Sequence, residues 1–153
     1  MKLLAVLIHD EPDLRDLLAG MLEAWTRYEV TVERVGFGAR LPGPMKRWIE
    51  EAGLFIVGLE RYYAQGRCAE GVDTAEMLFK LGKKVLVVGS ECKAKDVGVP
   101  FYWDIALEKS FLEAARDVLD APIPGREERE KFAKFFEKRR EKPVGHGAKS
   151  NSI

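Results

Sequence analysis

The stretch KLLAVLIHDEPDLRDLLAGML, residues 2–22, decides the fold class, because a buried strand followed at once by an amphipathic helix begins an α/β domain. Lys2–Ile8 is almost wholly apolar, which is typical of a strand buried on both faces of a parallel sheet. Pro12 then opens a helix, at a position where the missing backbone N–H costs little. One face of this helix is apolar at helical spacing and is expected to point inward. That face consists of Leu14, Leu17, Leu18, Met21, Leu22 and Trp25.

The alternation of strands and helices continues to about residue 120. Glu29–Val35 alternates apolar and polar side chains, which is typical of an edge strand. Further strands are predicted at Leu54–Leu59, Lys84–Ser90 and, in a shorter form, Val97–Trp103. Further helices are predicted at Met45–Ala52, Asp73–Gly82 and Leu107–Leu119. This order predicts a doubly wound parallel five-stranded α/β sheet with helices on both faces.

The third predicted helix carries both a start and a stop signal. Asp73 and Glu76 have the N-cap to N3 spacing of a capping box. Gly82 is a residue type that commonly ends a helix. These signals predict a helix that begins at Asp73 and ends just before Gly82.

The chain divides into three parts by composition. The α/β domain is expected to occupy residues 1–120, and the segment APIPG, Ala121–Gly125, marks its end. A linker and a charged helix are expected over residues 121–142, followed by a disordered tail over residues 143–153. Residues 121–153 hold nine basic and five acidic side chains, so the tail carries +4 and the domain carries −4 in a neutral chain.

Three phenylalanines stand out in the charged helix. Phe132, Phe135 and Phe136 share one helical face because they are spaced at i, i+3 and i+4. A solitary helix of this length is marginal in water unless its apolar stripe is buried, and three exposed rings would form an unusual patch. We expect this face to pack on its own domain, on a second copy of the chain or on a protein partner.

Composition excludes several classes of function. The chain has 153 residues, of which 46% are hydrophobic and 33% charged, as in a globular domain. Its net charge of zero argues against a nucleic-acid or anionic-membrane binder. The N-terminus lacks the features of a signal peptide and no apolar run approaches membrane-spanning length. Two cysteines outside any CxxC pair favour a reduced, cytoplasmic protein.

Residues 1–120 resemble the receiver domains of two-component response regulators. Three segments carry the resemblance: VLIHDEPDLRDLLAGML (6–22), EEAGLFIVGLE (50–60) and VDTAEMLFKLGKKVLVVGS (72–90). The resemblance implies a flavodoxin-like sheet order 2-1-3-4-5 and a role in signal transduction through protein interaction.

The resemblance also implies which positions would carry receiver chemistry. Receivers use an aspartate after the third strand to accept a phosphoryl group, acidic residues after the first strand to hold Mg²⁺, a hydroxyl after the fourth strand and a lysine after the fifth. Asp10, with Glu11, falls at the metal position, and Ser90, or Gly89 beside it, falls at the hydroxyl position. Gly58 falls at the acceptor position and Asp104 near the lysine position. The resemblance therefore implies a degenerate receiver, a pseudo-receiver that cannot be phosphorylated in the usual way and needs no cofactor.

The polar residues near this crevice also have structural interpretations. Asp10 and Glu11 would cap the first helix, and we favour this reading because two carboxylates without a third ligand make a poor Mg²⁺ site. Glu60 is a candidate for that third ligand. His9 is either a general base or, as we favour, a hydrogen-bonded residue at a strand end.

Aromatic residues cluster near the predicted carboxyl ends of the strands. They either line a pocket or partner surface, or fill the space that a receiver leaves for its phosphoryl site. These residues are Tyr62, Tyr63, Phe101, Tyr102 and Trp103.

A second, weaker resemblance points to an enzyme. Residues 50–89 also resemble nucleoside deoxyribosyltransferases and TIR-type nucleotide hydrolases, in which a glutamate on the helix after an apolar strand is catalytic. That resemblance implies Glu76 as the nucleophile or ribose-contacting group, assisted by Asp73 or Tyr63. The capping-box interpretation explains Asp73 and Glu76 without chemistry, so we favour a non-catalytic receiver-like domain.

Overall fold

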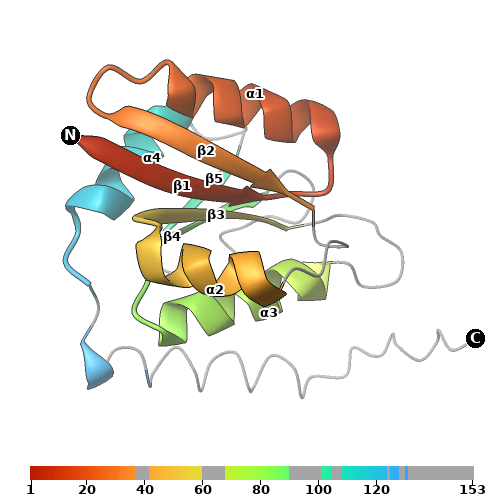
Figure 1. Ribbon diagram of the computed structural model, residues 1–153, viewed down its shortest axis with the longest axis vertical. Coiled ribbons are helices and arrows are strands. Elements are labelled where there is room, and N and C mark those ends of the chain that lie inside the picture. The colour runs from red at the N-terminus through yellow and green to blue at the C-terminus, as the bar shows by residue number, and fades with distance from the viewer. Residues whose placement is uncertain are drawn as a thin grey trace, which may run out of the picture.

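The described strands form a single parallel sheet. The computed structural model describes residues 1–36, 42–59, 68–89, 101–104, 108–123, 125–127 and 130. The strand order is β2-β1-β3-β4-β5, which confirms the predicted flavodoxin-like α/β fold and places β2 at an edge (Figure 1). The strands are β1 (Lys2–Ile8), β2 (Glu29–Val35), β3 (Leu54–Leu59), β4 (Val85–Gly89) and β5 (Tyr102–Asp104).

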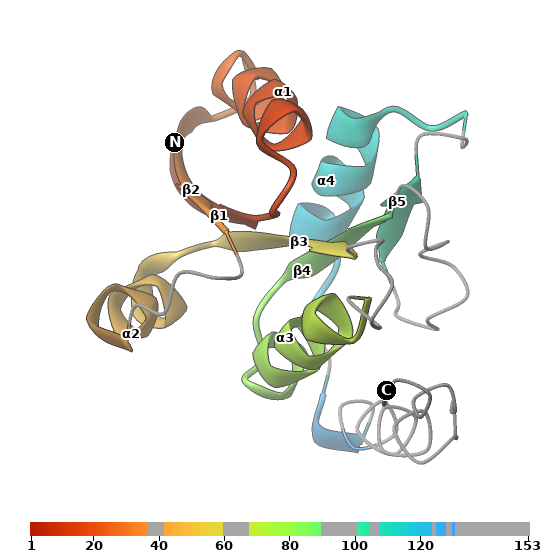
Figure 2. The same cartoon turned by 90° about the vertical axis from the view of Figure 1, so that its right-hand side faces the viewer.

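Helices cover both faces of the sheet, as the alternating order predicts. They are α1 (Pro12–Glu23), α2 (Pro42–Glu51), α3 (Cys68–Lys80) and α4 (Phe111–Asp120). Figure 2 shows α1 and α4 on one face and α2 and α3 on the other. In the part of the chain that the structure describes, no helix is both long and apolar enough to cross a membrane.

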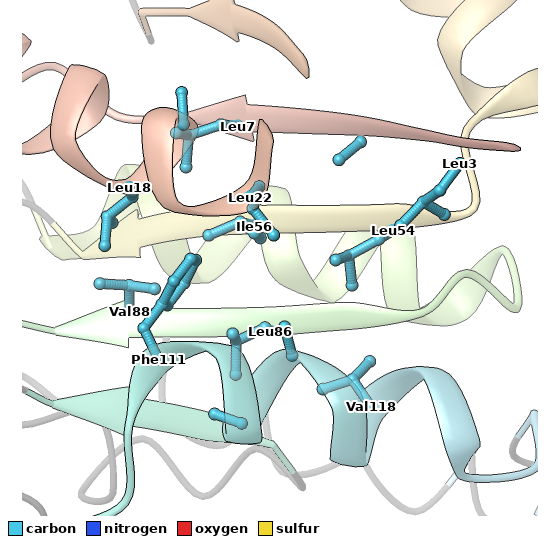
Figure 3. Close-up of a cluster of buried hydrophobic side chains, with 14 residues drawn as sticks. Leu3, Leu7, Leu18, Leu22, Leu54, Ile56, Leu86, Val88, Phe111 and Val118 are labelled. Carbon is cyan, nitrogen blue, oxygen red and sulfur yellow. The ribbon is translucent and has the colours of Figure 1, made fainter. Parts of the chain in front are cut away.

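The two faces of the sheet make two separate cores, which is why the central strands are apolar on both sides. Leu18 and Leu22 of α1 and Phe111 of α4 meet Ile56 and Leu86 of the strands in one core (Figure 3). The other core lies under α2 and α3, and its largest members are Trp48, Phe55, Leu78, Ile8, Val57 and Val87. A strand between two cores has no solvent-exposed face. The first polar residue after β1 therefore lies beyond the carboxyl end of the strand.

The inward face of α1 is narrower than predicted. Leu18, Ala19 and Leu22 are buried against the sheet, whereas Leu17 and Met21 are exposed. The six apolar residues span an arc wider than the surface that one sheet face offers. The small side chain of Ala19 lets the helix approach closely, and this orientation turns Leu17 and Met21 outward.

The predicted start of the third helix is wrong. Helix α3 begins at Cys68, so Asp73 lies inside it and the capping box of Asp73 and Glu76 does not exist. The spacing is a local signal that also occurs within helices, and here the chain is already helical before it. The predicted stop is confirmed, because Gly82 has a φ of 79° and Lys83 N donates to Leu78 O at 3.0 Å.

Helix α4 begins at a capping box that the sequence prediction missed. Ser110 Oγ accepts from Glu113 N at 3.1 Å, and the Glu113 carboxylate accepts from Ser110 N at 3.0 Å. The predicted helix began at Leu107, whereas the observed one starts at Phe111. The serine therefore stands at the boundary and orients Phe111 toward the core.

The carboxyl end of α4 is tied to two other elements. Lys84 Nζ donates to Leu119 O and to Ala121 O, both at 2.6 Å, so a cation closes the helix. Arg27 Nη2 lies 2.6 Å from Asp120 Oδ1, and this hydrogen bond holds the pKa of Asp120 below its usual value. The stability from this exposed pair is present above the unfolded-state pKa of the carboxyl group and is lost as the pH falls through the lowered pKa.

Ser110→Ala is expected to lower the free energy of unfolding by about 1 kcal/mol, because the first turn of α4 loses its side-chain acceptor. Ser110→Asp is the matched control, since aspartate caps equally well and should retain most of the stability. Urea unfolding followed by circular dichroism measures both. Equal losses in the two variants would contradict the capping role.

Candidate functional site

The crevice residues predicted from the resemblance to receiver domains include His9 and Gly58, which lie where β1 and β3 end side by side. Ile8 of β1 is in register with Val57 of β3, so the next residues, His9 and Gly58, are neighbours. Strand alternation directs both toward the face that carries α1 and α4, because Leu7 and Ile56 belong to the core of that face. The structure therefore brings together two of the predicted crevice residues.

The imidazole of His9 lies directly over Gly58. A Cβ atom at Gly58 would stand 2.1 Å from His9 Cδ2 and 2.7 Å from His9 Nε2. Such distances are far inside van der Waals contact, so the ring occupies the space that any side chain at position 58 would need. Glycine is required here for a steric reason, and the histidine fills the space that the glycine leaves.

Backbone hydrogen bonds hold the His9 ring in place. His9 is only 3% exposed, and its Nδ1 accepts from Glu11 N at 3.0 Å. Because Nδ1 is an acceptor, the neutral ring carries its proton on Nε2. His9 N donates to Val35 O at 2.9 Å, and Arg15 Nη1 donates to His9 O at 2.8 Å. These bonds fit the predicted structural role of a hydrogen-bonded histidine at a strand end.

Asp10 is directed toward the end of β2 and has a cation nearby. Its Oδ1 lies 3.0 Å from the position of a Cβ on Gly36, and Arg15 Nη1 lies 3.5 Å from the same point. Glu11 is the N-cap residue of α1, yet its side chain makes no capping hydrogen bond. The described residues contain no cluster of three or more side chains suited to hold a metal ion. Asp10 and Glu11 as a Mg²⁺ site therefore stay a prediction.

Asp104, which the resemblance places near a receiver's lysine position, is the last residue of β5. Asp104 is in register with Gly89 and lies two residues after Tyr102, on the face of the sheet opposite His9. The first lysine after β5 is Lys109, which sequence analysis did not single out. Its ammonium lies 2.5 Å from Asp117 Oδ2 of α4, and its carbonyl accepts from the Trp103 indole at 2.7 Å. A search of the sequence for the first basic residue after the fifth predicted strand would have found Lys109.

Several predicted site residues lie outside the described residues. Glu60, Ser90, Tyr62 and Tyr63 are among them, as is the side chain of Asp73. The described aromatic residues of this group pack against the cores, and Phe101 and Tyr102 also line a pocket, so both predicted alternatives stay open. Phe101 and Trp103 pack against the core under α1 and α4, and Tyr102 packs against the other core.

Glu76 lies on α3, across the sheet from the His9 ring. It is 5% exposed, and its Oε2 lies 2.9 Å from Lys80 Nζ one turn along the helix. The carboxylate is therefore a buried group paired with a half-exposed cation. The structure does not bring Glu76 together with His9 and Gly58, because α3 covers the opposite face (Figure 2).

A pocket of about 310 Å³ opens beside β5 and α4. Its described lining includes the apolar residues Leu86, Phe101 and Ala114 and the charged residues Lys109 and Asp117. The His9–Gly58 contact and Glu76 are not among the described residues that line it. The pocket therefore belongs to neither candidate site.

Comparison with solved structures finds a response regulator with the same fold. The match is to ChrA of a heme-sensing two-component system, with a TM-score of 0.53 and 16% identical residues. It covers 93% of this chain and 67% of that one. At this identity the likeness shows a shared fold, a five-stranded parallel sheet of the flavodoxin-like, receiver-like kind.

The other comparisons give weaker matches or none. Two mutant flavo di-iron proteins from Thermotoga maritima match with a TM-score of 0.40 and 14% identity, and the chain spans 36% of their length. No protein-family model matches the chain, and the search of curated proteins gives no match.

Gly58→Ala is expected to lower the free energy of unfolding by about 1–3 kcal/mol, because the new methyl group overlaps the His9 ring. The loss should shrink when His9→Ala is combined with it, since the double variant removes the overlap. Gly20→Ala is the matched control. Nothing lies within 4 Å of a Cβ at Gly20, which is inside α1, so that variant should gain about 0.5–1 kcal/mol.

Denaturant unfolding of the parent, Gly58→Ala, His9→Ala, the double variant and Gly20→Ala measures these free energies. Gly58→Ala as stable as the parent, or a double variant whose loss equals the sum of the two single losses, would show that the ring does not occupy the place of a side chain at position 58.

Proposed function

We propose that this chain is a non-catalytic, receiver-like signalling domain that cannot be phosphorylated in the usual way and acts by binding another protein. The observation that carries the proposal is the His9 imidazole over Gly58, at the strand ends where a receiver has its acid pair and its phospho-acceptor. A glycine offers no nucleophile, and the ring leaves no room for one.

The charges around this site agree with the proposal. Phosphoryl transfer needs cations and a metal to neutralise developing negative charge. Arg15 is bonded to the His9 carbonyl, and Lys109, the first lysine after β5, is paired with Asp117. Both cations support local structure, so neither is placed to read a phosphoryl group at position 58.

A receiver-like fold without phosphorylation chemistry still offers surfaces for protein binding. The neutral net charge does not favour nucleic acid or membrane, which leaves a protein partner or a second copy as the natural ligand class. In such a domain the fixed His9–Gly58 contact would hold one conformation in place of two that interconvert on phosphorylation.

Incubation with acetyl phosphate and Mg²⁺ is expected to give no phosphoryl adduct on the wild-type protein, because position 58 has no carboxylate. Intact-mass spectrometry measures the adduct, and a phosphorylatable receiver domain run in parallel shows that the assay works. An aspartyl phosphate mapped to Asp10 or to any residue near β1 and β3 would overturn the proposal.

Two variants separate the missing nucleophile from the blocking ring. Gly58→Asp alone should remain unmodified or fold poorly, since the new side chain meets the His9 ring. The double variant His9→Asp/Gly58→Asp supplies the acceptor and a second acidic residue beside Asp10, and it should gain an adduct. An adduct on the single variant would show that the ring does not block the site.

The enzyme interpretation makes a different prediction for Glu76. Because its carboxylate is buried beside Lys80, we expect Glu76→Gln to lower stability by about 1 kcal/mol while no catalytic activity changes. Product analysis of NAD and nucleosides by liquid chromatography checks this for both proteins. Cleavage by the wild type that is lost in Glu76→Gln would replace the receiver-like proposal with a nucleotide- or nucleoside-cleaving enzyme.

A further inference from the structure

Helix α3 presents an apolar pair to the outside of the molecule. Its inner side, with Ala75 and Leu78, is buried in the core. On the outer side Met77 is 38% exposed and Leu81 is 50% exposed. The two are one helical turn apart, since Leu81 N donates to Met77 O at 3.1 Å, and together they form a stripe that the described chain leaves uncovered.

The chain after α4 passes from one face of the sheet to the face that carries α3 (Figure 2). Helix α4 packs on the face opposite α3, yet residues 125–127 lie beyond α3, on its side away from the sheet (Figures 1 and 2). Pro122 lines a small cavity with Phe79 and Lys83, which places the crossing at the carboxyl end of α3. Ile123, on the same crossing, is 57% exposed. The described chain therefore leaves the domain near the carboxyl end of α3.

From this structure we infer that the segment carrying Phe132, Phe135 and Phe136 packs within the same chain onto the Met77–Leu81 stripe of α3. The segment has already begun a helix, because Arg126 Nε lies 3.0 Å from Glu130 Oε2 across one turn. Helical rise of about 1.5 Å per residue brings the three rings about 9–15 Å past Arg126, which is within the length of α3.

Spacing and direction fit this arrangement. Phe132 and Phe136 are four residues apart, as are Met77 and Leu81, so both pairs extend about 6 Å along their helices. Because the segment enters at the carboxyl end of α3, it runs antiparallel to it. Phe132 then lies near Leu81, and Phe136 lies near Met77.

Charge and the short link to α4 favour the chain's own C-terminal segment over a second copy or another protein on the Met77–Leu81 stripe. Glu127 and Glu130 stand at the start of the segment, and Lys83 stands at the end of α3 where the segment arrives. The short connection after α4 also holds the segment at a high effective concentration next to α3. This inference does not depend on the chemistry at Gly58, so either proposal can fail alone.

The test is a double-mutant cycle on the full chain. One variant changes Met77 and Leu81 to serine, a second changes the three phenylalanines to serine, and a third combines all five changes. Each of the first two should lower the Tm by about 4 °C or more, and the combined variant should fall little further, because both disrupt one contact.

The chain offers a matched control on α1. Leu17 is 59% exposed and Met21 is 36% exposed, with the same four-residue spacing. Changing this pair to serine should shift the Tm little, and its effect should add to that of the phenylalanine changes. Hydrogen exchange gives a second readout: amides of residues 131–140 should lose at least about tenfold protection in the Met77/Leu81 variant and keep it in the α1 control.

Three results would overturn the inference. Additive Tm shifts in the cycle, or fast exchange of residues 131–140 in the wild type, would show that the segment does not pack on α3. A dimer mass in light scattering, with coupling that disappears on dilution, would assign the segment to a second copy. A protein monomeric at all concentrations, with a non-additive cycle, supports packing within one chain.

Discussion

Burial of β1 on both faces is the constraint on which the rest of the molecule depends. The strand lies between β2 and β3 and between two helical layers, so its side chains from Leu3 to Ile8 enter one core or the other, and only Lys2 at its start is exposed. Such a strand tolerates no polar group until it emerges from the sheet. His9 is the residue at which the strand emerges, and the Nδ1 atom of its buried ring accepts a hydrogen bond from the backbone N–H of Glu11.

The contact of His9 with Gly58 makes the residue sizes at two neighbouring strand ends depend on each other. One position contributes a large ring and the other contributes no side chain, and the combined space is filled. In a receiver the same strand ends keep acidic groups around an open crevice. In this chain the His9 ring packs over Gly58 at these strand ends, and Asp10 is directed toward Gly36 beside the guanidinium of Arg15. The chain shares the flavodoxin-like fold, and the proposal that it lacks receiver chemistry rests on this packing.

The periphery is held mainly by polar contacts at helix ends. Helix α4 starts at the Ser110 capping box and ends under the Lys84 ammonium, and Arg27 joins its last residue, Asp120, to the turn before β2. These contacts fix where the chain leaves the domain. The described chain leaves the domain near the carboxyl end of α3, where Pro122 lines a small cavity with Phe79 and Lys83.

The sequence by itself determined the order of elements, the parallel sheet and the edge position of β2, because hydrophobic periodicity is a local consequence of burial. It also marked Gly82 as a helix stop and Gly58 as a site without a nucleophile. Only the tertiary structure decided which members of an apolar helix face are buried, as Leu17 and Met21 show. It also decided that Asp73 lies inside a helix and that Ser110 begins one. The His9 ring over Gly58 belongs to this second group, since residues 49 positions apart meet only through strand pairing, and a steric fit between strands leaves no periodic signal in either.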